Sequence, residues 1–128
     1  MQFMTPEWAE AYTQAWNSDS KVMNKLKKMS FVLQFSISDR EELEPVVIEV
    51  RKGVCTTFGT KEQYDNIEFY IWGDTDSWKK IFDSNISIQK AMKSDGFGFK
   101  GPKLKAMMNM SGLERGIAIM REMKEVTV

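Results

Sequence analysis

Four hydrophobic residues near the start of the chain recur at the spacing of a helix. They fall at positions i, i+4, i+7 and i+8 and are Trp8, Tyr12, Ala15 and Trp16. Just before them, Thr5 is suited to cap a helix, Pro6 suits its first turn, and Glu7 complements the positive end of the helix dipole. The pattern therefore predicts an N-terminal helix that buries an aromatic stripe.

A second helix is predicted after the polar run 17–20, which can cap it. Met23, Leu26 and Met29 follow at intervals of three residues. The positions around this stripe include four lysines, namely Lys21, Lys25, Lys27 and Lys28. We interpret these lysines as a solvated helix face rather than as a patch for nucleic acid or membrane.

From Phe31 the hydrophobic period changes to two, which is typical of half-buried strands. The alternation occupies four segments, at residues 31–38, 46–50, 54–58 and 67–73. Lys52-Gly53 separates the second segment from the third, and a glycine there allows the positive φ of a tight hairpin turn. The acidic stretch 39–45 and the polar stretch 59–66 are the predicted loops between the other segments.

Helical spacing returns at Asp74 or Thr75, either of which can cap a helix that ends at 83–85. The apolar face of this helix carries Trp78, Ile81 and Phe82. Ile88 and Met92 indicate a short further helix, and residues 96–100 indicate a fifth strand. Pro102 then opens a methionine-rich helical region, and Ser111 is suited to cap the last helix, whose inner stripe is Leu113, Ile117 and Met120.

This order of elements has no regular alternation of strand and helix, which excludes a parallel α/β fold. We expect an α+β fold with a five-stranded, mainly antiparallel sheet covered by helices on one face. No Pro/Gly/Ser-rich linker divides the chain, so we expect one domain over 1–128. Its parts are the N-terminal helices at 1–30, four strands at 31–73, helices and a fifth strand at 74–101, and a C-terminal helical segment at 102–128.

Composition narrows the functions that this fold can carry. The 128 residues include 18 lysine and arginine and 18 aspartate and glutamate residues, so the net charge is zero, which argues against a general nucleic-acid binder. Histidine is absent, which excludes histidine-dependent triads and histidine metal ligands. The single cysteine, Cys55, lies in a strand-like run without a positive neighbour, and we interpret it as a buried inert thiol. We expect no bound metal or cofactor.

No segment approaches the ~18 apolar residues that a membrane span requires. The first residues lack the basic and apolar regions of a signal peptide, and the chain ends in Val126-Thr127-Val128, which is no retention or peroxisomal address. The sequence therefore predicts a cytoplasmic location.

The run Gly96-Phe97-Gly98-Phe99-Lys100-Gly101 matches the letters of a dinucleotide-binding motif. In such a fold the motif follows a strand and opens a helix, whereas here the run itself has the pattern of a strand. The remaining chain is helical and lacks the second strand. We therefore interpret the glycines as positions where something packs closely on the strand.

Methionine is the most distinctive component, with ten residues, six of them at or after Met92. These residues could be ordinary core fillers, or they could form a surface that accepts variable apolar partners. Met107, Met108 and Met110 cannot share one helical face. Either the helix breaks near Asn109, or some of these side chains point away from the sheet, and a cavity under this segment would accommodate both.

The segment from Ile67 to Met123 resembles the sterol carrier protein-2 family of lipid-binding domains. The matching features, in order, are the apolar strand Ile67–Trp72, the turn Gly73-Asp74, a helix with Trp78 and Phe82, the short helix Ile86–Met92, the strand opening at Asp95-Gly96-Phe97, and a Leu/Met-rich C-terminal stretch. The helix with Trp8 and the strands from Phe31 to Phe58 fit the same layout. The resemblance implies an apolar tunnel between sheet and helices that holds fatty-acyl chains, sterols or other lipids, and no enzymatic activity.

We therefore expect a non-catalytic carrier that binds an apolar ligand, such as a fatty acid or a fatty acyl derivative, in an internal tunnel with 102–128 as its lid. The candidate tunnel residues are Trp78, Phe82, Phe97, Phe99, Leu104, Met107, Met108, Met110, Leu113, Ile117 and Met120. The alternative is a protein–protein interaction or homodimerisation module that uses an exposed Met/Phe surface.

Overall fold

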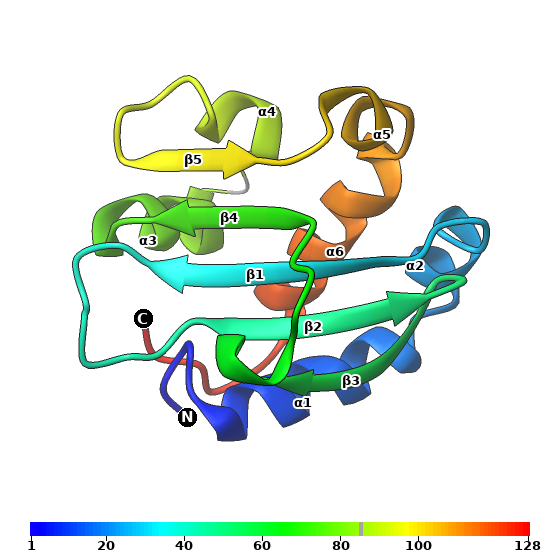
Figure 1. Cartoon of the computed structure of the whole chain (residues 1–128). Helices are drawn as coiled ribbons and strands as arrows, with labels where there is room; N and C mark the ends of the chain where they lie inside the picture. Colours follow the sequence, from blue (N-terminus) through cyan, green and yellow to red (C-terminus); the bar gives the residue numbers. More distant parts are fainter. Residues whose placement is uncertain (85) are drawn as a thin grey trace.

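The computed structural model describes residues 1–84 and 86–128, and in this part of the chain six α-helices accompany one five-stranded sheet (Figure 1). The helices are α1 (Pro6–Asn17), α2 (Ser20–Lys25), α3 (Thr75–Ser84), α4 (Ile88–Ala91), α5 (Lys103–Met108) and α6 (Met110–Glu122). The strands are β1 (Phe31–Ile37), β2 (Val46–Arg51), β3 (Val54–Gly59), β4 (Phe69–Gly73) and β5 (Phe97–Lys100). The predicted α+β fold is confirmed.

The strands lie in the order β3-β2-β1-β4-β5. Strand β1 pairs antiparallel with β2 and parallel with β4, and the β2–β3 and β4–β5 pairs are antiparallel. The segment between β3 and β4 crosses the sheet from one edge to the other side of β1, as Figure 1 shows, and includes a short 3₁₀ helix at Lys61–Gln63. This crossover is what makes the central pair parallel in a mainly antiparallel sheet.

The alternation in β1 decides which face of the sheet the helices cover. Phe31, Leu33, Phe35 and Ile37 are buried, and the residues between them are half-buried. Their neighbours in register, such as Ile48 on β2 and Ile71 on β4, are buried on the same face. Helix α6 lies behind this sheet in Figure 1, so the helical layer and this row of side chains form the core.

The β2–β3 connection is the predicted tight hairpin. Lys52 and Gly53 both have positive φ, at 49° and 83°. A Cβ at position 53 would also overlap the carbonyl oxygen of Met23, and the Gly53 amide donates to the Met29 carbonyl at 3.2 Å. Glycine is therefore required here both by the backbone conformation and by the close approach of α2 and the segment after it.

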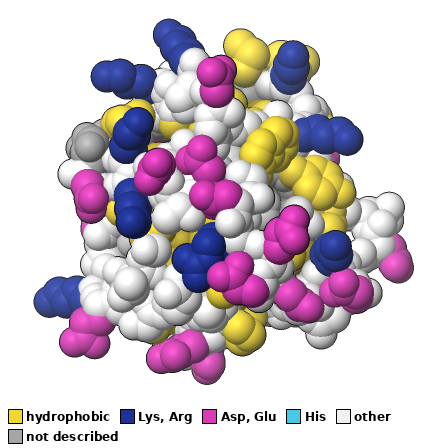
Figure 2. Space-filling view, turned by 90° about the vertical axis from the view of Figure 1, so that its left-hand side faces the viewer, with side chains coloured by type: hydrophobic (Ala, Val, Ile, Leu, Met, Phe, Trp, Pro, Cys, Tyr) yellow, Lys and Arg dark blue, Asp and Glu magenta, His cyan; other side chains and the backbone are white. Residues whose placement is uncertain are grey.

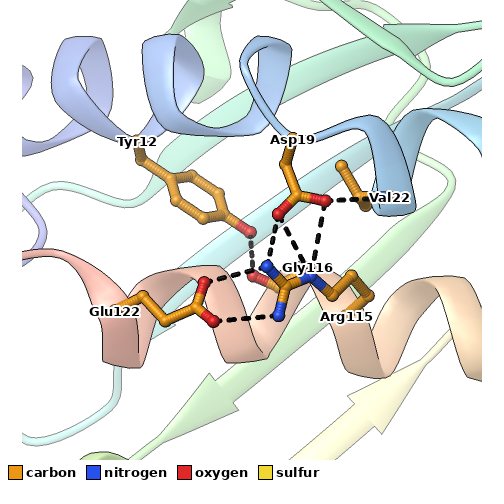
Figure 3. A network of polar contacts seen from close by, with 6 residues as sticks. All are labelled: Tyr12, Asp19, Val22, Arg115, Gly116 and Glu122. Carbon is orange, nitrogen blue, oxygen red and sulfur yellow. Dashed lines mark hydrogen bonds and ion pairs between the residues drawn. The ribbon is translucent and has the colours of Figure 1, made fainter.

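A polar network fastens α6 to the N-terminal helices (Figure 3). The Arg115 guanidinium pairs with Asp19, which also caps α2 by accepting from the Val22 amide at 2.8 Å. On its other side Arg115 pairs with Glu122 at 2.9 Å, and the buried Tyr12 hydroxyl donates to the Gly116 carbonyl at 2.8 Å. These contacts fix the C-terminal helix against α1 and α2.

Several boundaries differ from the sequence pattern. Helix α2 ends at Lys25, so Leu26 and Met29 are buried from the turn that follows it. Strand β4 begins at Phe69 rather than at Ile67, because the crossover still occupies Ile67. Helix α3 is described to Ser84, and Asn85 of the predicted helix end lies outside the described residues. Among the helices that the structure describes, none has the length and apolar composition needed to cross a membrane.

Candidate functional site

A cavity of about 250 Å³ lies between the β4–β5 edge of the sheet and helices α4, α5 and α6. Its lining consists of Ile71, Ile88, Met92, Phe99, Lys103, Ala106, Met107, Met110 and Leu113. Eight of these nine residues are hydrophobic, and Lys103 alone is charged. A small apolar space with one cationic group at its wall suits a ligand that has a hydrocarbon part and an anionic part.

The floor of the cavity comes from the sheet. Ile71 on β4 and Phe99 on β5 are partners in register, so both side chains point to the helical face. Ile71 is buried, whereas Phe99 is half-buried and its ring lies 5.6 Å from that of Phe69. The strand pairing therefore sets a rigid apolar floor under the helices.

The far wall depends on a break in the C-terminal helical region. Asn109 is both the last cap of α5 and the first cap of α6, and its side-chain amide donates to the Lys105 carbonyl at 2.8 Å. Both alternatives left open by the sequence therefore occur, since the helix breaks at Asn109 and Met108 is exposed. Because the helix axis changes there, Met110 and Leu113 line the cavity from α6 while α5 contributes Met107 at the rim.

Helix α4 forms the roof and is fastened to α6. The Glu114 carboxylate accepts from the Ile88 amide at 2.7 Å, and Ser87 caps the same helix by accepting from the Lys90 amide at 3.1 Å. Arg121 donates to the carbonyls of Ile81 and Ile86, which flank the end of α3. Charged side chains of α6 therefore hold the short helix that places Ile88 and Met92 over the cavity.

The structure separates the eleven candidate residues into three groups. Four line the cavity, namely Phe99, Met107, Met110 and Leu113. Five belong to the packed core, namely Trp78, Phe82, Phe97, Ile117 and Met120. Of these, Phe82 is half-buried at the margin of the core. Two are exposed on α5 and do not line the cavity, namely Leu104 and Met108.

Five lining residues were not among the sequence candidates: Ile71, Ile88, Met92, Lys103 and Ala106. Ile71 and Ile88 have the pattern of ordinary core residues, and only the position of α4 over β4 brings them to the cavity. Lys103 directly follows Pro102 at the start of a helix with methionines. This position was the one feature of the sequence that could have identified Lys103 as a lining residue.

Four larger hollows lie at the described surface, and each is lined by several polar or charged residues. Two of them exceed 600 Å³. One, of about 830 Å³, borders the ends of β1 and β2 and includes Glu49, Arg51, Lys52 and Glu68. The other, of about 610 Å³, lies between the start of α1 and the loop with Glu42 and Glu44. The smaller cavity is the stronger candidate because its lining is almost wholly hydrophobic.

Reactive groups are not gathered at the cavity. Cys55 is 3% exposed on β3, next to α1, and burial raises the pKa of its thiol to about 11. Over residues 1–84 and 86–128, no three His, Cys, Asp or Glu side chains lie together as metal ligands would. Lys103 is the only titratable side chain among the residues that line the cavity.

A model of the family described as "SCP-2 sterol transfer family" matches residues 10–114. The crystal structure of sterol carrier protein 2 is similar, with a TM-score of 0.80, 17% identity, and coverage of 94% of this chain and 98% of that chain. The solution structure of a conserved hypothetical protein from Thermus thermophilus has a TM-score of 0.77 at 17% identity, covering 95% of this chain and 90% of that chain.

The same fold occurs as a small part of a larger protein. The inverting sec-alkylsulfatase Pisa1 from Pseudomonas sp. matches at a TM-score of 0.52 and 12% identity, covering 76% of this chain but 14% of that chain. No curated protein sequence matches the chain significantly. At these identities the structural likenesses establish the fold.

Proposed function

The chain belongs to the SCP-2 sterol transfer family, and we propose that it binds and carries an apolar ligand in the cavity between β4–β5 and helices α4, α5 and α6. The observation that carries this proposal is the lining, in which eight of nine residues are hydrophobic. Removal of each methylene group from water contributes about 0.8 kcal/mol, so hydrocarbon binds there without polar anchors.

The ligand class follows from the size and charge of the cavity. Its volume of about 250 Å³ is below that of typical ligand pockets, so a long acyl chain fits only if the space extends into a tunnel. Met92, Met107 and Met110 have flexible side chains that can move to admit such a chain. Lys103 would then pair with an anionic group, which favours a fatty acid or a fatty acyl derivative over a neutral sterol.

We assign the protein no catalytic role, and we place its action in the cytoplasm. The chain has no histidine, and its one thiol is buried, away from the cavity. The carrier function requires only that the ligand enters, remains shielded from water and leaves unchanged.

The test compares three methionines that neighbour each other in the sequence. Met110→Gln places an amide against hydrocarbon, so it should weaken binding of a fluorescent fatty acid about tenfold while leaving the melting temperature nearly unchanged. Met107→Gln should have a smaller effect, since this side chain is 68% exposed at the rim. Met108→Gln is the matched control, because its side chain is 76% exposed and lies outside the lining.

Native mass spectrometry of the purified protein should also detect a co-purifying lipid. The proposal fails if the wild type binds no apolar probe, or if the Met110 and Met108 variants bind it equally well. Affinity that falls only in step with stability would likewise count against it.

One observation favours the alternative of a protein–protein interaction or homodimerisation module. Leu104, Met107 and Met108 are exposed together on α5, where a partner chain could cover them. Such a module would show an empty cavity by mass spectrometry and an association that depends on Leu104 and Met108.

A further inference from the structure

Helix α5 carries the most exposed of the large hydrophobic side chains in the described part of the chain. Leu104, Met107 and Met108 stand at positions i, i+3 and i+4 and are 72%, 68% and 76% exposed. The other large exposed hydrophobic residues of the described part, Val54, Phe58 and Trp72, reach at most 41%. An apolar stripe of this kind on a surface helix indicates an interaction surface.

The strand register places this stripe at one end of the sheet, together with most of the lysines. Lys100 on β5 pairs with Tyr70 near the start of β4, and Val50 near the end of β2 pairs with Phe31 at the start of β1. Three segments meet at this end, at residues 21–30, 51–53 and 100–111, and they hold nine lysine and arginine residues and no aspartate or glutamate. We call this surface the lysine end.

Hydrogen bonds confirm that the three segments adjoin. The Lys105 ammonium donates to the Ser30 carbonyl at 3.0 Å, and the Lys25 ammonium donates to the Ser111 hydroxyl at 2.8 Å. The Gly53 amide donates to the Met29 carbonyl at 3.2 Å. Among the described residues, the ion pairs at the lysine end are Lys105–Glu68 and Arg51–Glu49, so most of its positive charge is not balanced locally.

The opposite end of the sheet is acidic. Ile37 pairs with Gly73, so the segments after β1 and β4 leave the sheet at the same end. Residues 39–44, 74–76 and 95 contribute seven carboxylates and one arginine there, and Lys80 and Lys90 border the same hollow as Asp74, Asp76 and Asp95. Figure 2, which faces this end, shows the Asp and Glu side chains interspersed with Lys and Arg side chains. Acidic residues therefore outnumber basic ones at this end, whereas the three segments of the lysine end carry basic residues only.

We propose that the lysine end docks on an anionic lipid surface, with Leu104, Met107 and Met108 entering the interfacial layer. Lysines near a negatively charged membrane are attracted to it, and apolar side chains beside them add the burial of their methylene groups. Charge polarity also selects this occupant, because the acidic end is repelled while the lysine end is attracted, which orients the molecule.

This inference goes beyond ligand binding and can be tested separately. Leu104 and Met108 do not line the cavity, and neither do Lys27 and Lys28 in the turn after α2. Changes at these four exposed residues should therefore leave the affinity for a fluorescent fatty acid unchanged.

The experiment measures co-sedimentation of the full chain with vesicles of phosphatidylcholine, with and without phosphatidylglycerol. We expect binding only to the anionic vesicles and its loss at about 0.5 M salt, where surface charges are screened. Leu104→Ser and Lys27→Glu/Lys28→Glu should each weaken this binding about tenfold or more. The matched controls are Phe58→Ser, at a hydrophobic residue 37% exposed on another edge, and Lys79→Glu/Lys80→Glu on α3.

The proposal is overturned if anionic vesicles do not bind the protein, or if the variants at the lysine end bind as the controls do. It is also overturned if light scattering shows a homodimer that Leu104→Ser dissociates while vesicles bind neither protein, since a second copy then covers α5. Loss of fatty-acid binding with vesicle binding intact would reject the carrier function alone.

Discussion

At the scale of single residues, Asp19 combines two structural roles. It caps α2 through the Val22 amide and pairs with Arg115 of α6, and its side chain is 13% exposed. The Arg115 guanidinium beside it lowers the pKa of this carboxyl below its usual value of 3.8. Because the pKa is lowered in the folded state, the pair stabilises the fold above about pH 4 and loses its effect as the pH falls through the folded value.

Asp19→Asn should therefore lower the free energy of unfolding by about 2 kcal/mol at pH 7, because Arg115 loses a charged partner in a largely buried place. Urea unfolding at pH 7 and at pH 3 should show a smaller difference between the two pH values for the variant than for the wild type. Glu42→Gln is the control, since the Arg40–Glu42 pair is at the surface and Glu42 is 64% exposed. Equal losses in the two variants would contradict this role of Asp19.

Cys55 is predicted to be dispensable. Its thiol lies 3.8 Å from the Thr13 hydroxyl and 3.7 Å from the Thr57 carbonyl, both of which can satisfy a serine hydroxyl. Cys55→Ser should cost at most about 1 kcal/mol and leave fatty-acid affinity unchanged. With a thiol pKa of about 11, alkylation of the native protein at pH 8 should be slow. Rapid alkylation without unfolding would be the contrary result.

At the scale of elements, the contact between α2 and α6 depends on a glycine. A Cβ at position 112 would overlap the Leu26 side chain, which is fully buried and has little room to move. Gly112→Ala should therefore lower the free energy of unfolding by about 1–3 kcal/mol, although alanine favours a helix by up to about 1 kcal/mol.

A double-mutant cycle identifies the partner. In the Leu26→Ala background the overlap is gone, so Gly112→Ala should become neutral or stabilising. Ser111→Ala, at the exposed neighbouring position, should change the stability little in either background. If Gly112→Ala is equally destabilising in both backgrounds, Leu26 is not the neighbour that requires glycine.

Local patterns predicted most elements because most strands and helices bury one hydrophobic face. Strand β3 is an exception, since Val54 and Phe58 of its predicted inner face are 41% and 37% exposed. The alternation from Phe31 to Ile37 matches β1 in every position, and the Lys52-Gly53 turn is where the pattern placed it. The hydrophobic pattern did not predict the parallel pairing of β1 with β4, since this pairing depends on the path of the crossover rather than on the sequence of either strand.

The cavity was harder to predict than the fold for the same reason. Met107 and Met108 are neighbours of the same type, yet one lies at the rim and the other faces away. This difference arises from the helix break at Asn109. The direction of α5 relative to α6 at that break depends on how α6 packs against α2 through Gly112. Hydrophobic spacing thus identified the right segment but could not separate lining from core or surface.

At the scale of the whole molecule, the charge distribution changes the interpretation of the lysines after residue 20. In the sequence they resemble one solvated helix face, but the fold adds Lys52, Lys100 and Lys103 to the same end. These positive charges form one surface only because the strands bring segments that are distant in the sequence to the same end of the sheet. The net charge of zero gives no indication of how acidic and basic residues are distributed between the two ends of the sheet.

The two ends of the chain also meet. Gln2 forms a parallel bridge with Thr127, the Phe3 amide donates to the Thr127 carbonyl at 2.8 Å, and the Thr127 amide donates to the Met1 carbonyl at 2.8 Å. A short glycine–serine link could therefore close the chain into a ring, and the ring could be reopened elsewhere.

A circular permutant that begins at Glu42 and ends at Glu41 should fold with an unchanged circular dichroism spectrum, because both residues are exposed in the loop after β1. Opening the ring between Lys52 and Gly53 should instead be strongly destabilising, since it cuts the hairpin turn packed on Met23 and Met29. If both permutants unfold at the same denaturant concentration, the hairpin is not the constraint inferred here. A chain whose ends meet in this way can also be inserted into a loop of another protein without being stretched.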